Sequence, residues 1–138
     1  REAELEAARA TVERKVAERT GELAESEARF RGALDHAAIG MALVAPDGRF
    51  LRVNRALVGI VGYSESDLLA RTFQEITHPD DLAADLAHGR RLLAGEVETY
   101  QMEKRYVHRA GHPVSALLSV SLARDAAGAP LYFISQVQ

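Results

Sequence analysis

The residues best suited to acid–base or metal chemistry lie together in the segment His78-Pro79-Asp80-Asp81. An imidazole beside two carboxylates could exchange protons with a substrate or bind a divalent metal, as in a small hydrolase. The same residues also suit the start of a helix, because proline fits the first helical position and carboxylates favour the positive end of the helix dipole. We favour the helix start and predict neither catalytic nor metal-binding residues in this chain.

Other chemistries find less support in the sequence. The chain has no cysteine, which excludes disulfides, thiolate metal sites and cysteine nucleophiles. Gly59 and Gly62 are isolated and no Lys-Ser or Lys-Thr follows them, so a phosphate-binding loop is absent. The imidazole of His88 could ligate haem iron, and this keeps a haem-binding receptor as an alternative. The prediction is that the chain holds no cofactor.

Length and charge narrow the class of protein. The 138 residues are 47% apolar and 27% charged, which suits one compact domain rather than two. The net charge of -3 gives no general attraction to nucleic acid or to anionic lipid, so we expect neither as a partner. No apolar run approaches the ~20 residues of a membrane-spanning helix. The chain begins without Met or a signal-peptide pattern, and we expect an internal, cytoplasmic piece of a longer protein.

The first 31 residues form a separate segment, in which 15 positions are charged. Its apolar residues follow a heptad frame typical of a coiled-coil seam. We therefore predict an N-terminal helix over 1–31 that pairs with a second copy, followed by a domain over 32–138. The alternative is a solvated helix without a partner, which Gly21 favours because glycine costs about 1 kcal/mol inside a helix. The predicted interface residues are Leu5, Val12, Val16, Leu23 and Phe30.

The remaining sequence alternates between strands and short helices. Apolar runs and turn residues predict five strands, at 39–44, 49–53, 98–108, 114–123 and 131–138. Three short helices are expected between residues 54 and 76, and a longer one over 79–94. This order predicts an α+β fold, a five-stranded antiparallel sheet with helices on one face. The opposite face is also apolar, so we expect the N-terminal helix or a second subunit to cover it.

Several short motifs follow one another along residues 47–128: Asp47-Gly48-Arg49-Phe50, Asn54, Gly62-Tyr63-Ser64, His78-Pro79-Asp80-Asp81, Gly95-Glu96, Glu103-Lys104-Arg105-Tyr106, Gly111, Ser119-Val120-Ser121-Leu122, Asp125 and Gly128. In this order and at these distances they resemble the PAS domain, specifically the S-box type of bacterial sensory proteins. The resemblance covers about residues 27 to 138. Before it, Val16-Ala17-Glu18-Arg19-Thr20 and Glu22-Leu23 look like the signalling helix that precedes such domains in histidine kinases and cyclic-di-GMP enzymes.

The resemblance implies a non-catalytic sensory and dimerisation module. Such a module would pass a conformational change to a downstream effector, such as a histidine kinase or a diguanylate cyclase or phosphodiesterase. Two positions depart from the family, because this chain has Ala110 in place of a common Asp and Ser115 in place of a common aromatic residue. The alternative of a flavin-binding receptor cannot include the light-sensing branch, which requires a reactive cysteine.

In this family the interior between helices and sheet is the usual sensing pocket. Apolar residues at strand spacing are first of all core, so we favour a filled core that transmits signals through its partner surface, and a small-molecule cavity is the alternative. The candidate pocket residues are Met41, Leu43, Tyr100, Met102, Leu118, Phe133 and Ser135.

Overall fold

A computed structural model describes residues 2–138, which fall into two units, one ending at Ala33 and the other spanning Leu34–Gln138. The first unit belongs to a single helix, α1 (Glu2–His36), which passes through Gly21 without a break and continues five residues beyond the expected end at residue 31. Leu34, in its last turn, is already part of the second unit and is buried there.

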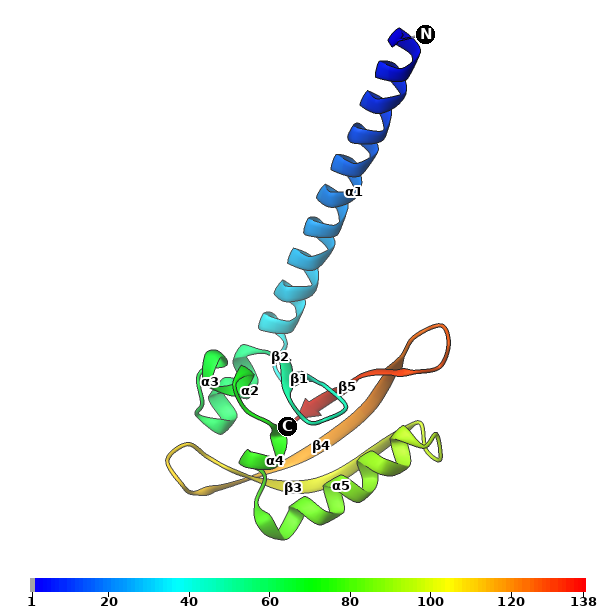
Figure 1. Ribbon diagram of the computed structural model, residues 1–138. Helices are drawn as coiled ribbons and strands as arrows, with labels where there is room; N and C mark the ends of the chain where they lie inside the picture. The colour runs from blue at the N-terminus through cyan, green and yellow to red at the C-terminus, as the bar shows by residue number, and fades with distance from the viewer. Residues whose placement is uncertain (1) are drawn as a thin grey trace. The chain divides into compact units, whose positions relative to one another are not determined.

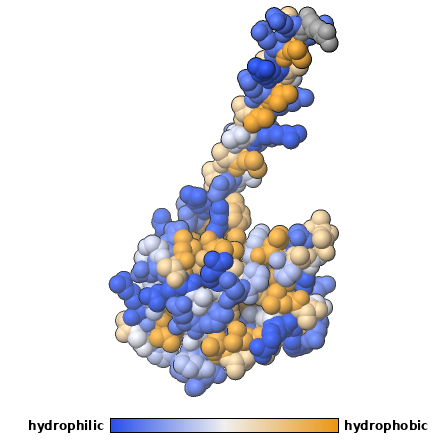
Figure 2. Space-filling view, viewed as in Figure 1, coloured by the Kyte–Doolittle hydropathy of each residue, from blue (hydrophilic) through white to orange (hydrophobic). Residues whose placement is uncertain are grey.

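The apolar side chains of α1 lie on its surface. Leu5, Val12, Val16 and Leu23 are between 59% and 71% exposed, and Phe30 is 45% exposed. Figure 2 shows hydrophobic side chains recurring among hydrophilic ones along this helix. A helix whose apolar stripe is this exposed gains little stability from its own chain, because most helical stability in proteins comes from packing that stripe.

The second unit contains four further helices, each placed by local capping. Asn54 and Gly62 bound α2 as expected: the Asn54 side chain accepts from the Leu57 N–H, and Gly62 has φ +78°, a conformation that favours glycine. His78 caps the longest of the four, where the predicted proline start is confirmed. The helices are α2 (Arg55–Val61), α3 (Glu65–Leu69), α4 (Phe73–Ile76) and α5 (Pro79–Leu93).

The strands form one antiparallel sheet in the order β2-β1-β5-β4-β3 (Figure 1). The first and second strands form a hairpin, and the last three form two longer ones. The two groups join through β1 and β5. The predicted five-stranded α+β fold is therefore confirmed. The strands are β1 (Gly40–Val44), β2 (Phe50–Val53), β3 (Thr99–Val107), β4 (Pro113–Arg124) and β5 (Pro130–Val137).

The core lies between one face of the sheet and the helices. Paired residues share a face, so the ladder that runs Ala42, Ser135, Val120, Tyr100 across four strands defines the inner face. Side chains from α2, α4 and α5 pack onto it, and α5 runs alongside β3 (Figure 1). The most deeply buried side chains of this core are Leu57, Leu68, Ile76, Leu92, Val61 and Val137.

Candidate functional site

A cavity of about 140 Å³ opens between the inner face of the sheet and the helices. An apolar protein cavity of about 150 Å³ is large enough to hold benzene, so this one has room for a small organic molecule. Most of its wall is aliphatic or aromatic, but several polar side chains reach it. The wall comprises Ala42, Val44, Pro46, Phe50, Leu57, Phe73, Gln74, Asp85, Leu86, Gly89, Arg90, Leu93, Tyr100, Lys104, Tyr106, Leu118, Val120, Phe133, Ser135 and Val137.

The wall contains a buried ion pair. Lys104 Nζ of β3 lies 2.6 Å from Asp85 Oδ2 of α5, and the two side chains are 1% and 2% exposed. The Tyr100 hydroxyl donates to the other Asp85 oxygen at 2.8 Å. Both carboxylate oxygens are thus hydrogen-bonded, which is the condition under which a charge can be buried. These bonds join the middle of α5 to the sheet from inside the core.

Burial and the neighbouring rings set the electrostatics of this pair. Burial lowers the pKa of Lys104, while the Asp85 carboxylate partly opposes the shift. The ammonium also lies over two aromatic rings, 4.5 Å from the centroid of Tyr106 and 5.0 Å from that of Phe73. Burial raises the pKa of Tyr100 and of Tyr106, so both hydroxyls remain protonated at neutral pH.

Gln74, in α4, lines the cavity and carries an unpaired polar atom. Its Nε2 donates to the Asp47 carbonyl at 3.2 Å, but its buried Oε1 has no hydrogen-bond partner. Gly48 makes room for this side chain, because a Cβ at Gly48 would collide with the Gln74 amide. An unsatisfied buried acceptor is costly, so Oε1 is a group that a ligand could pair.

One buried residue connects the end of α1 with the cavity wall. Asn54, 1% exposed, accepts from the N–H groups of Met41 and Leu57 at 2.8 and 3.0 Å. Its amide donates to the carbonyls of Leu34 and Ile39 at 2.8 and 2.9 Å. Its side chain therefore links four places: the last turn of α1, Ile39 just before β1, Met41 within β1, and the first turn of α2. Leu57 of that turn lines the cavity.

Five of the seven predicted pocket residues lie on the inner face of the sheet. Tyr100, Leu118, Phe133 and Ser135 lie on the cavity wall, and Met102 packs against the core without lining the cavity. Their role in binding stays a prediction.

The expectation that Met41 and Leu43 face inward is wrong. Ala42 pairs with Ser135 and Val44 with Phe133, so alternation along β1 turns Met41 and Leu43 to the other face of the sheet.

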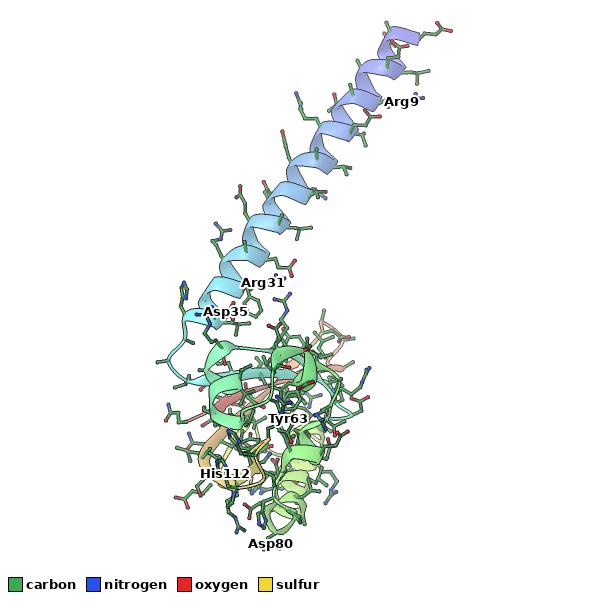
Figure 3. All side chains as sticks on the ribbon, turned by 90° about the vertical axis from the view of Figure 1, so that its left-hand side faces the viewer. Arg9, Arg31, Asp35, Tyr63, Asp80 and His112 are labelled. Atoms are coloured by element: carbon green, nitrogen blue, oxygen red, sulfur yellow. The ribbon has the colours of Figure 1, made fainter. Side chains whose placement is uncertain are left out.

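The segment that suggested acid–base chemistry starts a helix and joins it to the sheet. His78 Nδ1 accepts from the Asp80 N–H, and Asp80 lies exposed at the end of α5 (Figure 3). Asp81 accepts three hydrogen bonds from the backbone and guanidinium of Arg105, which lower its pKa to about 2. His88, the candidate haem ligand, stacks on the Tyr100 ring with centroids 5.0 Å apart. Within residues 2–138, no cluster of three potential metal ligands occurs.

Sequence reasoning missed the ion pair and the glutamine amide among the cavity-lining residues. Asp85 falls within the apolar stripe of α5, between Leu82 and Leu92. Lys104 falls in the alternation of β3 that places Tyr100 and Tyr106 inward. One acid and one base, each at a core position of its own element, could have been predicted to pair. Nothing in the sequence pattern singled out Gln74.

Comparison with known proteins identifies the family of this chain. The sequence model of a family described as PAS fold matches residues 28–138. The chain is 50% identical over 116 residues to the probable diguanylate cyclase DgcE of Escherichia coli (strain K12). It is 32% identical over 100 residues to the sensor histidine kinase TmoS of Ectopseudomonas mendocina. These matches cover 84% and 72% of this chain but 10% of each relative.

Solved structures show the same fold. The PAS domain of a protein from Colwellia psychrerythraea superposes with a TM-score of 0.73 at 13% identity, covering 84% of this chain and 95% of that one. The identity is too low to carry function, so this likeness concerns the fold alone. Among the described helices, none combines the length and apolarity needed to cross a membrane.

Proposed function

Because the chain belongs to the PAS-fold family, we propose that it is a sensory and signal-relay module of a larger cytoplasmic signalling protein. Residues 1–31 act as its signalling helix and residues 32–138 as its sensory domain. The module itself carries out no chemistry, and it controls an effector elsewhere in the parent protein. The two curated relatives, a probable diguanylate cyclase and a sensor histidine kinase, support an effector of one of these two classes.

The observation that carries the proposal is the hydrogen bonding of Asn54. Its amide holds the Leu34 carbonyl of α1, while its oxygen holds the first turn of α2 beside the cavity. A change in the packing around the cavity that moves α2 must move Asn54 or break these bonds. Either outcome changes the support of the last turn of α1. A relay needs two arrangements of this kind, biased by different contacts.

Self-association through α1 is the second part of the proposal. Four apolar residues of the predicted seam are more than half exposed, and burying them against a second copy would stabilise the helix. The outer face of the sheet carries Leu117, which is 41% exposed, and this face supplies a further surface for such a dimer. A small molecule in the cavity, or a signal arriving through α1, would then shift the dimer between states.

The molar mass of the full chain in solution, measured by light scattering over a concentration series, tests this proposal. We expect a dimer, and we expect Val16→Glu with Leu23→Glu to make it a monomer. Ala24→Glu with Ala28→Glu adds the same charge off the seam and should leave the dimer intact. A full chain that is monomeric at every concentration, or two double variants that behave alike, would contradict pairing through this seam.

A further inference from the structure

The polar groups of the cavity wall narrow the ligand that it can hold. We propose that the cavity binds a small uncharged molecule with an apolar body and a group that both accepts and donates hydrogen bonds, such as an alcohol or a primary amide. This inference rests on the proposed sensory function and specifies the ligand class of that site.

The accepting part of the ligand is required by Lys104. A lysine ammonium has three N–H donors, and Asp85 takes one of them at 2.6 Å. The rings of Phe73 and Tyr106 attract the charge through their faces, and among the described residues Asp85 is the one acceptor hydrogen-bonded to this ammonium. The ammonium is 1% exposed and lines the cavity, so an oxygen placed there by a ligand would pair with a buried charged donor.

The donating part is required by Gln74. Its Oε1 is buried without a hydrogen-bond partner, and the Gln74 side chain lines the same cavity. A hydroxyl or amide N–H of the ligand would remove the desolvation penalty of this acceptor. A purely apolar ligand would leave both Lys104 and Gln74 unsatisfied.

The buried ion pair is the reason why we expect a ligand without net charge. Asp85 and Lys104 neutralise one another within the wall, so an ionic ligand would enter a largely apolar space without a free counter-charge. Arg90 also reaches the wall, but it is an exposed residue, so solvent and salt weaken its attraction for an anion. The apolar body would pack against Phe50, Leu118 and Phe133.

The test uses four probes of nearly the same size with the full chain. Cyclohexanol, methylcyclohexane, cyclohexanecarboxylate and cyclohexylamine are each titrated while the backbone amides are followed by two-dimensional NMR. We expect cyclohexanol to bind at least tenfold more tightly than the other three, with shifts at residues around the cavity. Tighter binding of the hydrocarbon or of either ion, or no binding by any probe, would overturn the proposal.

Two variants locate the binding site. Gly89 lines the cavity, and a Cβ there would meet open space, so Gly89→Leu should fill the cavity and abolish binding without a steric clash. Gly59→Leu makes the same change on the exposed side of α2, where a Cβ is also unobstructed, and should leave binding unchanged. Equal binding by these two variants would show that the probe binds elsewhere.

A third variant tests the polar contact itself. Asp85→Leu with Lys104→Met replaces the pair by apolar side chains, a change that folded proteins often tolerate. This double variant should bind cyclohexanol at least tenfold more weakly than the native chain does. Its affinity for methylcyclohexane should not fall. Binding is read here without reference to association or relay, so failure of this proposal would leave the dimer measurement to decide the proposed function separately.

Discussion

Removing one partner of the buried Asp85–Lys104 pair should destabilise the domain strongly. Lys104→Met leaves the Asp85 carboxylate, 2% exposed, with the Tyr100 hydroxyl as its remaining hydrogen-bond donor among the described residues. Breaking a buried pair from one side typically costs about 3–5 kcal/mol, because the remaining charge is uncompensated. We expect a loss of that size for Lys104→Met and a similar loss for Asp85→Leu.

The double variant separates the pair from its two members. Asp85→Leu with Lys104→Met removes both charges, and buried pairs replaced by apolar residues often come out neutral or more stable. We therefore expect a free energy of unfolding within about 2 kcal/mol of the native chain, and a strongly non-additive cycle.

Urea unfolding followed by the near-ultraviolet circular dichroism of tyrosine measures these effects. All four tyrosines lie within residues 34–138, so the signal reports on the second unit. Arg91→Met serves as control, because it removes an α5 side chain from an exposed pair with Glu96, which lies just after the helix, and should cost less than about 1 kcal/mol. Two outcomes would refute the idea that Asp85 and Lys104 are shielded from water and depend on each other. One is additive losses of unfolding free energy, and the other is single variants that lose no more than Arg91→Met.

Three further predictions concern residues at which elements of the domain contact one another. Asn54→Asp keeps the acceptor for the Leu57 N–H but loses two donated bonds, and should cost at least about 2 kcal/mol in the same urea assay. Gly62→Ala forces φ +78° on alanine and drives its methyl into the His108 imidazole; it should cost more than about 1 kcal/mol, partly recovered by adding His108→Ala. Asp81 has its pKa lowered from 3.8 to about 2 by Arg105, so its contribution to stability is present above about pH 4 and is lost as the pH falls toward 2; thermal unfolding of Asp81→Asn should show a smaller drop over this window than the native chain.

The order of elements could be predicted because local residues determine it. The Asp47-Gly48 turn, the Asn54 cap and the proline at the start of α5 act within a few residues of themselves. Each of these positions has the conformation that its residue type favours. The same holds for Gly128, whose N–H donates to the Asp125 carbonyl in the last hairpin.

Which side chains of β1 lie on the inner face of the sheet could not be predicted in the same way. Both of its faces carry apolar side chains, so alternation alone does not tell the inner face from the outer one. Its register with β5, which pairs Ala42 with Ser135, decides the matter. That pairing joins residues more than ninety positions apart, and no local pattern encodes it.

The polar part of the cavity was predictable only in principle. Asp85 and Lys104 occupy core positions of an amphipathic helix and an alternating strand, and their opposite charges suggest a pair. Glycine weakens a helix, yet α5 continues through Gly89, and the absence of a side chain there leaves space at the cavity. The four bonds of Asn54 depend on three segments that meet only in the folded domain.

In the proposed relay, the packing of the cavity and the pairing of α1 are coupled through Asn54. The dimer dissociation constant, measured by sedimentation for the full chain, tests it when Gly89→Leu is introduced alone and together with Asn54→Asp. We predict that filling the cavity shifts this constant about fivefold or more in the native background and much less in the Asn54→Asp background. Equal shifts in both backgrounds, no shift in either, or a chain that never dimerises would contradict this coupling through Asn54.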